Sequence, residues 1–209
     1  MSEHGEPLSF DRMYWEKGFY PFAGVDEAGR GALFGPVVAA AVVLSPDGRL
    51  SGFRDSKTIS ASRREELFEE LKSAGHEFSV GVVDAEEIDR TDILRATLKA
   101  MKMACEGISA ELKLVLVDGD RRPPLDTRVE TIVGGDRLSL SIAAASIVAK
   151  VTRDGLVREL AERFPGYGLE NNKGYGTKEH IAAVCENGPT PFHRKSFRPI
   201  SGIGRELWR

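Results

Sequence analysis

The chain has 209 residues, 41% of them hydrophobic and 29% charged, and its formal net charge is −3. These proportions are typical of a globular protein with a sizeable core, which excludes a disordered chain, and the length suits one domain over residues 1–209. The sequence shows neither an apolar run long enough to cross a bilayer nor a signal peptide, so we expect no membrane partner and a cytoplasmic location.

The start of the chain has no clear periodic pattern. Residues 1–18 are mixed polar and aromatic, and we interpret them as an N-terminal extension before a core of about residues 20–200. Residues 22–26 are a short apolar run that ends in acids, which is typical of a strand. Residues 36–44 are nearly all apolar, which predicts a central strand covered on both faces.

Helices and strands alternate in the middle of the chain. Ser60 or Ser62 is a suitable N-cap for a helix that continues to about Ser73. Residues 76–83 predict a third strand. A capping-box pattern then precedes helical periodicity over residues 88–105, which predicts one long helix.

The second half predicts two further strands and three helices. The strands are expected at residues 112–117 and 129–133. Residues 139–149 are rich in small side chains and predict a buried helix close to a sheet, and helices are also expected at 154–163 and 177–186. The whole pattern predicts an α/β fold with a mixed, about five-stranded central sheet flanked by helices.

Charge is uneven along the chain. Residues 137–209 hold 12 Lys and Arg against 7 Asp and Glu, so this part is basic and the remainder is acidic. A basic half is able to hold a phosphate backbone, although the same excess is also typical of an ordinary solvated surface.

Four acidic residues lie where predicted strands end. Asp26 and Glu27 end the first strand, Asp118 ends the fourth, and Asp136 follows a Gly-Gly pair after the fifth. Ligands of open α/β sheets bind beyond the strand ends. Singly, each acid is more typical of a solvated loop or a helix N-cap. Together they would repel one another unless a hard cation such as Mg²⁺ or Mn²⁺ neutralised them, which predicts a metal site suited to phosphodiester hydrolysis.

A glycine-rich segment over residues 29–35 follows the first strand. It invites comparison with a dinucleotide-binding loop, but the spacing is not G-x-G-x-x-G, and Pro36 with a strand-like run follows in place of a helix. We favour an interpretation in which the glycines let backbone amides approach a phosphate or sugar, with Arg30 beside them.

Motifs spread over residues 23–197 resemble those of bacterial ribonuclease HII, and they occur in the order of that family. They are Ala23-Gly-Val-Asp-Glu-Ala-Gly-Arg-Gly31, Gly35-Pro-Val-Val38, Asp55-Ser-Lys57, Val117-Asp-Gly119, Gly135-Asp136, Ala143-Ala-Ala-Ser-Ile-Val-Ala-Lys150 with Arg153-Asp154, Lys173-Gly-Tyr-Gly-Thr177 and His193-Arg194.

The resemblance implies a ribonuclease H-like fold and an endonuclease. Its substrates would be the RNA strand of RNA–DNA hybrids and ribonucleotides embedded in duplex DNA, cleaved on their 5′ side. Metal-assisted attack by water would leave 5′-phosphate and 3′-hydroxyl ends. The same resemblance makes Asp26, Glu27, Asp118 and Asp136 the catalytic carboxylates and metal ligands, with Mg²⁺ or Mn²⁺ as cofactor.

Substrate contacts are also implied by the resemblance. The turn formed by Gly29, Arg30 and Gly31 would read the 2′-hydroxyl, which distinguishes RNA from DNA, and Tyr175 would stack on the sugar at the RNA–DNA junction. Phosphate contacts are suggested for Ser56, Lys57, Lys150, Arg153 and Lys173, and a solvated surface role is equally compatible with each.

Other side chains near these motifs have less specific interpretations. Asp154 is compatible with a supporting acid or with an ion pair to Arg153 or Arg158. We expect His180 on a helix face or in the core, and we do not assign it or His193 as a metal ligand.

Three alternatives stay open. A binding module without catalysis would lack one of the acids, and a related DNA-specific or junction nuclease would require neither the glycine turn nor Tyr175. An unrelated hydrolase or cofactor enzyme would carry a G-x-S-x-G elbow or a P-loop, and the sequence contains neither.

We expect a monomer without a sliding-clamp peptide in its tail. An extra acid, Asp120, departs from the family pattern.

Overall fold

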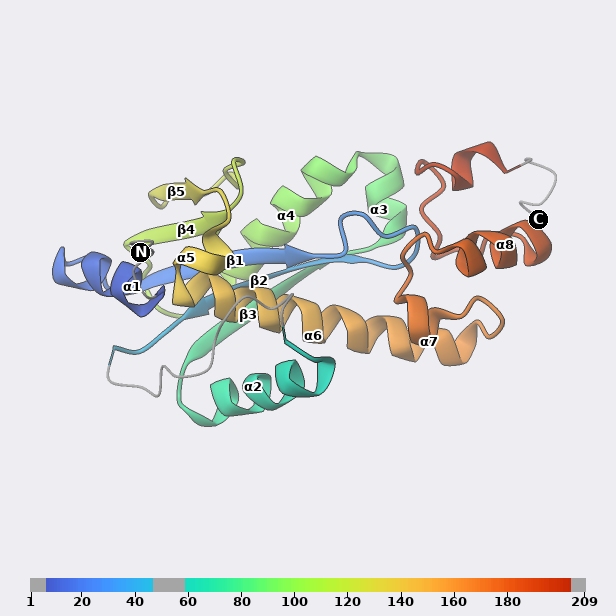
Figure 1. Cartoon of the computed structure of the whole chain (residues 1–209). Helices are drawn as coiled ribbons and strands as arrows, with labels where there is room; N and C mark the ends of the chain where they lie inside the picture. Colours follow the sequence, from blue (N-terminus) through green and yellow to red (C-terminus); the bar gives the residue numbers. More distant parts are fainter. Residues whose placement is uncertain (1–6, 47–58, 204–209) are drawn as a thin grey trace, which may run out of the picture.

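The computed structural model describes residues 7–46 and 59–203, arranged as one twisted sheet with helices on both faces (Figure 1). The predicted phosphate contacts Ser56 and Lys57 lie outside these residues. No helix in the described part of the chain has both the length and the apolar character needed to span a membrane.

The sheet is mixed, as predicted. Its strands are β1 (Phe22–Ala28), β2 (Val37–Val43), β3 (Glu77–Val83), β4 (Leu114–Asp118) and β5 (Val129–Ile132). Their spatial order is β3-β2-β1-β4-β5. The strand β2 is antiparallel to both β1 and β3, whereas β1, β4 and β5 run parallel. The carboxyl ends of the three parallel strands therefore meet at one edge.

Eight α-helices and a short 3₁₀ helix surround the sheet in the described residues. They are α1 (Pro7–Glu16), α2 (Ala61–Ser73), α3 (Ala85–Arg90), α4 (Ile93–Glu106), α5 (Gly135–Leu138), α6 (Leu140–Arg163), α7 (Leu169–Asn172), α8 (Lys178–Asn187) and η1 (Ile200–Gly202). In Figure 1, α6 follows the length of the sheet on one face with α2 beyond it, and α4 covers the other face.

The helix α6 lies unusually close to β1. A Cβ atom added at Gly24 would come within 2.2 Å of the carbonyl carbon of Ser141, so only glycine fits there. Alanines and Ile147 of α6 are fully buried against β2 and against Leu67 and Leu71 of α2. The small residues that predicted a buried helix thus serve close packing, and this packing holds α6 in fixed register against the strand that carries Asp26 and Glu27.

Helix boundaries differ from the predictions in two places. The segments predicted at 139–149 and 154–163 form the single helix α6, because residues 150–153 contain no helix breaker. The helix predicted at 88–105 is interrupted, since Asp92 accepts a hydrogen bond from the backbone NH of Arg95 and thereby caps a new helix, α4.

The chain start is also more structured than a simple extension. Residues 7–16 form α1, and its Asp11 is fully buried. Both carboxylate oxygens of Asp11 accept hydrogen bonds, at 2.7 Å from the Ser139 hydroxyl and at 2.7 and 2.8 Å from the hydroxyl and NH of Ser141. This helix is therefore anchored at the junction between α5 and α6.

Candidate active site

A pocket opens at the edge where the parallel strands end. The residues that line it come from β1 and its following turn, from the end of β4, and from α2, α6 and the segment before α8. They are Asp26, Glu27, Ala28, Gly29, Arg30, Gly31, Arg64, Asp118, Ser146, Lys150 and Tyr175.

Asp26 lies within β1, which continues to Ala28 instead of ending at Asp26 as predicted, because Glu27 and Ala28 still pair with β2. The side chain is almost fully buried, and one carboxylate oxygen accepts the NH of Glu27 at 2.7 Å. Burial raises the pKa of Asp26 well above its ordinary value, and the charges of Glu27 and Asp118 raise it further. Asp26 therefore lies in a crowded negative environment.

Glu27 shares this environment. Burial raises the pKa of Glu27, with a further contribution from Asp118, whereas the Arg30 guanidinium opposes the shift. One guanidinium nitrogen of Arg30 lies 3.1 Å from a carboxylate oxygen of Glu27. This contact compensates the charge of Glu27 in part.

Asp118 and Asp136 come from neighbouring parts of the chain. An oxygen of Asp118 accepts the NH of Gly135 at 2.7 Å, and Asp136 follows in the first turn of α5, where it is buried. Gly134 adopts the left-handed region, with φ of 69°, so the chain can turn from β5 into α5. The structure thus places three of the four predicted carboxylates in one pocket, whereas Asp136 is buried nearby in the chain and does not line the pocket.

Oxygen ligands of this kind fit a hard divalent cation. Among residues 7–46 and 59–203, no three Asp, Glu, His or Cys side chains are grouped tightly enough to hold a metal ion as they stand. The mutual charge repulsion of Asp26, Glu27 and Asp118 nevertheless favours a cation, and carboxylates suit Mg²⁺ or Mn²⁺. The donor chemistry therefore fits the predicted metal.

The raised pKa values of Asp26 and Glu27 predict pH-dependent metal binding. A cation binds the ionised carboxylates, so the rise in melting temperature caused by Mg²⁺ or Mn²⁺ should grow as pH rises through the raised pKa values. Without metal, the folded chain binds these protons more tightly than the unfolded chain does, so this contribution to stability is lost as pH rises. Thermal unfolding from about pH 5 to about pH 8 tests both trends, and a pH-independent metal effect would contradict them.

The turn after β1 exposes backbone to the pocket. Gly29 has a φ of 93°, and a Cβ atom there would come within 1.9 Å of Nε of Arg153. Arg30 and Gly31 are exposed, and no atom would obstruct a Cβ at Gly31. Gly29 is therefore required by conformation and space, whereas Gly31 leaves room for a ligand.

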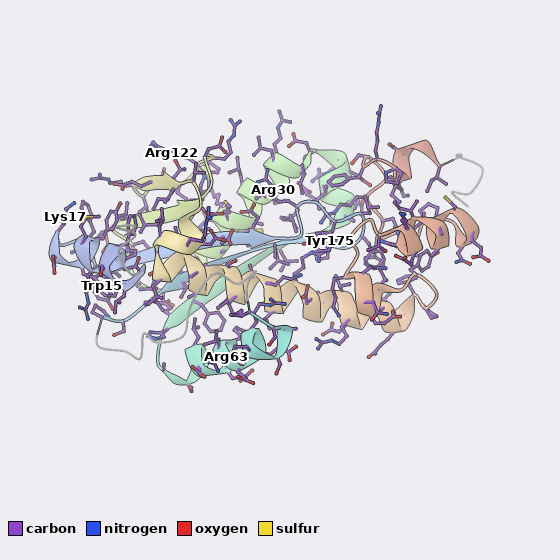
Figure 2. All side chains as sticks on the ribbon, in the orientation of Figure 1. Trp15, Lys17, Arg30, Arg63, Arg122 and Tyr175 are labelled. Carbon is purple, nitrogen blue, oxygen red and sulfur yellow. The ribbon has the colours of Figure 1, made fainter. Side chains whose placement is uncertain are left out.

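Tyr175 lies across the pocket from this turn, and Figure 2 labels both Arg30 and Tyr175. The residue is 36% exposed. The ring centre is 5.5 Å from Nζ of Lys150 and 5.2 Å from the guanidinium carbon of Arg153, which are cation–π distances. These contacts orient an aromatic face that remains accessible to a ligand.

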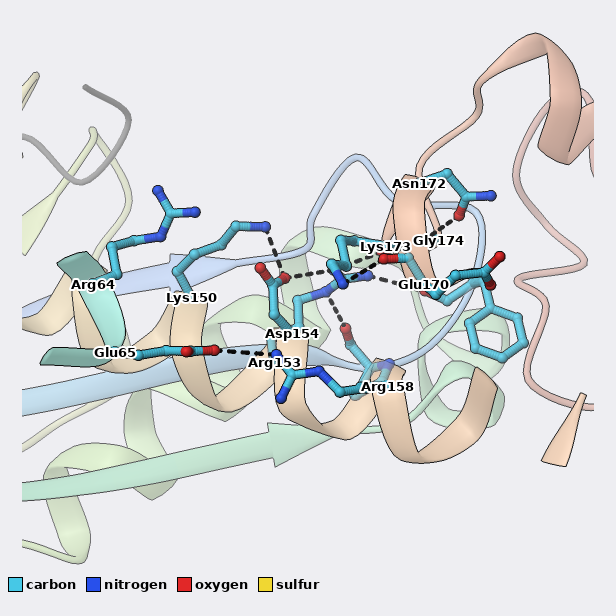
Figure 3. Close-up of polar contacts among 12 residues, drawn as sticks. Arg64, Glu65, Lys150, Arg153, Asp154, Arg158, Glu170, Asn172, Lys173 and Gly174 are labelled. Atoms are coloured by element: carbon cyan, nitrogen blue, oxygen red, sulfur yellow. Dashed lines mark hydrogen bonds and ion pairs between the residues drawn. The ribbon is translucent and has the colours of Figure 1, made fainter. Parts of the chain in front are cut away.

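The predicted phosphate contacts have different surroundings (Figure 3). Lys150 lines the pocket and donates to Asp154 at 2.8 Å. Lys173 donates to the carbonyl of Glu170 at 2.7 Å. Arg153 is fully buried and donates to three backbone carbonyls, a placement that favours a structural role over a phosphate contact.

The interpretations of Asp154 and His180 are also resolved. Asp154 pairs with Lys150 and, at 3.9 Å, with Arg153, which confirms the suggested pair with Arg153. Arg158 pairs with Glu65, so the alternative pair of Asp154 with Arg158 is wrong. His180 is buried, as expected for a core residue, and its Nε2 lies 3.1 Å from Nε2 of His193.

Two polar pocket residues, Ser146 and Arg64, were not predicted as site residues from the sequence. Ser146 of α6 hydrogen-bonds the side chain of Asp26 and opposes the rise in its pKa, and its polarity within an apolar segment was the available signal. Arg64 of α2 lines the pocket. The sequence carried no signal for Arg64, because only the packing of α2 brings it there.

Comparisons with known proteins agree with these observations. The family described as Ribonuclease HII matches residues 23–200. A Ribonuclease HII of Endomicrobium trichonymphae is 48% identical over 197 residues, which cover 94% of each chain. A Ribonuclease HII of Burkholderia mallei is 54% identical over 177 residues, which cover 85% of this chain and 83% of the relative. The crystal structure of ribonuclease H2 from Pyrococcus horikoshii superimposes with a TM-score of 0.74 at 26% identity, covering 90% of this chain and 99% of the other.

Proposed function

This chain belongs to the ribonuclease HII family, and from that premise we propose that the pocket beside β1 is its active site. The protein is a metal-dependent endoribonuclease that hydrolyses the RNA strand of RNA–DNA hybrids. One observation carries the assignment of the site: Asp26, Glu27 and Asp118 line the same pocket as the Gly29–Gly31 turn and Tyr175.

Each part of the pocket has a distinct task in this proposal. Asp26, Glu27 and Asp118 would hold a divalent cation, Mg²⁺ or Mn²⁺, which would supply charge neutralisation and activation of water. An oxygen of Asp118 accepts the NH of Gly135, and the neighbouring Asp136 is proposed as the fourth acid, although it does not line the pocket. Lys150 lines the same pocket and would contact the substrate phosphate. Attack of water on the phosphorus would form a new P–O bond and break the bond to the 3′ oxygen, which would take up a proton, so that the products would carry 5′-phosphate and 3′-hydroxyl ends.

Selection for RNA is assigned to the other side of the pocket. Backbone groups of the turn bind the 2′-hydroxyl, and the ring of Tyr175 stacks on the sugar. The same contacts fit a single ribonucleotide in duplex DNA, which is cut on its 5′ side. We also propose that the protein is a single-domain monomer located in the cytoplasm. The expectation about a sliding-clamp peptide falls on residues 204–209, which lie outside the described part of the chain.

A comparison of three duplexes tests the function. The protein is incubated with a duplex containing one ribonucleotide, with an RNA–DNA hybrid and with all-DNA duplex, in Mg²⁺ and in Mn²⁺. We expect cleavage of the first two and no cleavage of DNA. Intact ribonucleotide substrates in both metals would refute the function, and cleavage of all three would favour a nuclease without sugar selection.

A further inference from the structure

Two fully buried arginines contact the segments that carry the Gly29–Gly31 turn and Tyr175. Arg153 belongs to α6 and Arg194 to the segment after α8, and both side chains have 0% exposure. Burial of a guanidinium is costly unless hydrogen bonds compensate it. Among the described residues, the carboxylate nearest to either guanidinium is that of Asp154, which lies 3.9 Å from Arg153. Their compensation comes from the backbone.

Arg153 holds two segments that are distant in sequence. Its Nε and Nη2 donate to the carbonyls of Pro36 and Phe34 at 3.2 and 3.1 Å, in the loop that follows the Gly29–Gly31 turn. Its Nη1 donates to the carbonyl of Lys173 at 3.0 Å, two residues before Tyr175 (Figure 3). One guanidinium therefore bridges the glycine loop and the segment that carries Tyr175.

Arg194 reaches the turn itself. Its Nη1 donates to the carbonyl of Arg30 at 3.0 Å, and its Nε donates to the carbonyl of Gly35 at 3.0 Å. The backbone NH of Arg194 donates to Leu33 at 2.8 Å. The turn is thus held by a side chain from a third segment, so its position depends on the segment that follows α8.

Backbone contacts and packing complete the connection. The NH groups of Leu33 and Phe34 both donate to the carbonyl of Gly174, at 2.8 and 3.2 Å. The side chain of Arg153 also packs directly against Gly29, and its guanidinium lies 5.2 Å from the ring centre of Tyr175. Displacement of either arginine would therefore move the turn relative to Tyr175.

We propose that Arg153 and Arg194 are positioning residues that hold the Gly29–Gly31 turn in a fixed position relative to Tyr175. The turn and the tyrosine ring would then contact the 2′-hydroxyl and the sugar of the same ribonucleotide together. The inference rests on the proposed function. Arginine suits this task because its planar group donates in several fixed directions, whereas lysine offers one compact ammonium group. Neither arginine needs to touch the substrate.

Separate Arg194→Lys and Arg153→Lys variants test the coupling, with Arg158→Lys as a matched control. Arg158 lies on the same helix as Arg153, is exposed and pairs with Glu65. We expect kcat/KM on the single-ribonucleotide duplex to fall about tenfold in each test variant, more than on an RNA–DNA hybrid. The metal-induced rise in melting temperature should persist, because the carboxylates remain in place. The control should match the wild type in all three measurements.

A double-mutant cycle separates coupling from general loosening. If Arg194 acts through Tyr175, Arg194→Lys should cost less in a Tyr175→Ala background than in the wild type. Arg194→Gln is the replacement variant if lysine prevents folding, since its amide still donates to a carbonyl. Additive losses, or equal proportional losses on both substrates, would overturn the coupling.

The two levels of the proposal fail in different ways. A wild-type protein that cuts all-DNA duplex as well as ribonucleotide-containing duplex would refute the proposed function. A wild-type protein that selects ribonucleotides, with folded arginine variants that select them equally well, would refute only the coupling.

Discussion

Asp26→Asn is expected to reduce cleavage of an RNA–DNA hybrid by about a thousandfold or more while the fold is preserved. Stabilisation of transition-state charge by a bound cation contributes several kcal/mol, and about 4 kcal/mol corresponds to about a thousandfold in rate. Asparagine retains the shape of Asp26 and can still accept the NH of Glu27, but it removes the negative charge that would hold the metal. Cleavage rates in Mg²⁺ and Mn²⁺ measure the loss.

Stability distinguishes this loss from misfolding. Burial and the charges of Glu27 and Asp118 raise the pKa of Asp26, so an ionised Asp26 destabilises the metal-free fold near neutral pH. The Asp26→Asn variant should therefore melt at a higher temperature than the wild type without metal, and it should gain less from added metal. A variant that melts lower and is inactive would indicate structural damage instead.

Asp120→Asn is the matched control for the loss of one acid. Asp120 is exposed, lies two residues after Asp118 and pairs with Arg121 at 3.5 Å. It does not line the pocket, so its replacement should leave both cleavage and metal binding nearly unchanged. An active Asp26→Asn variant, in contrast, would remove Asp26 from the metal site.

Sequence reasoning succeeded where the pattern was local. The apolar residues of β2 and β4 predicted buried strands, and the acid at the end of β4 lies where the strand pattern placed it. Parallel pairing of β1 with β4 then brings Asp26 near Asp118, although they are far apart in the chain. Residues that follow neighbouring strands of an open α/β sheet gather beyond the strand ends, and this rule predicts that Asp26 and Asp118 lie close together.

Predictions were wrong or incomplete where tertiary contacts decide the outcome. Arg153 was suggested as a phosphate contact or a solvated surface residue, yet it is buried and three backbone carbonyls compensate its burial. The buried position of Asp11 depends on Ser139 and Ser141, more than a hundred residues away. Arg64 enters the pocket only through the packing of α2 on α6. None of these contacts has a signature in local sequence.

Tyr175→Ala is expected to reduce cleavage at a single embedded ribonucleotide by about 10-fold to 100-fold, in line with the value of stacking on an aromatic side chain, roughly 1–3 kcal/mol. The exposed face of the ring is available to the substrate, while Lys150 and Arg153 hold its orientation. An RNA–DNA hybrid offers 2′-hydroxyls at every position of the RNA strand, so its cleavage depends less on one stacking contact. Initial rates on the two substrates, measured side by side, give the ratio.

Tyr175→Phe provides the control, because it removes only the hydroxyl and keeps the ring in contact with Lys150 and Arg153. This variant should retain most of the wild-type preference if stacking is the main contribution. Loss of the preference in Tyr175→Phe would indicate that the hydroxyl, and not the ring, makes the main contribution. Equal loss on both substrates in Tyr175→Ala would argue against junction reading, because an aromatic face that serves only the general shape of the pocket has no reason to distinguish one ribonucleotide from many.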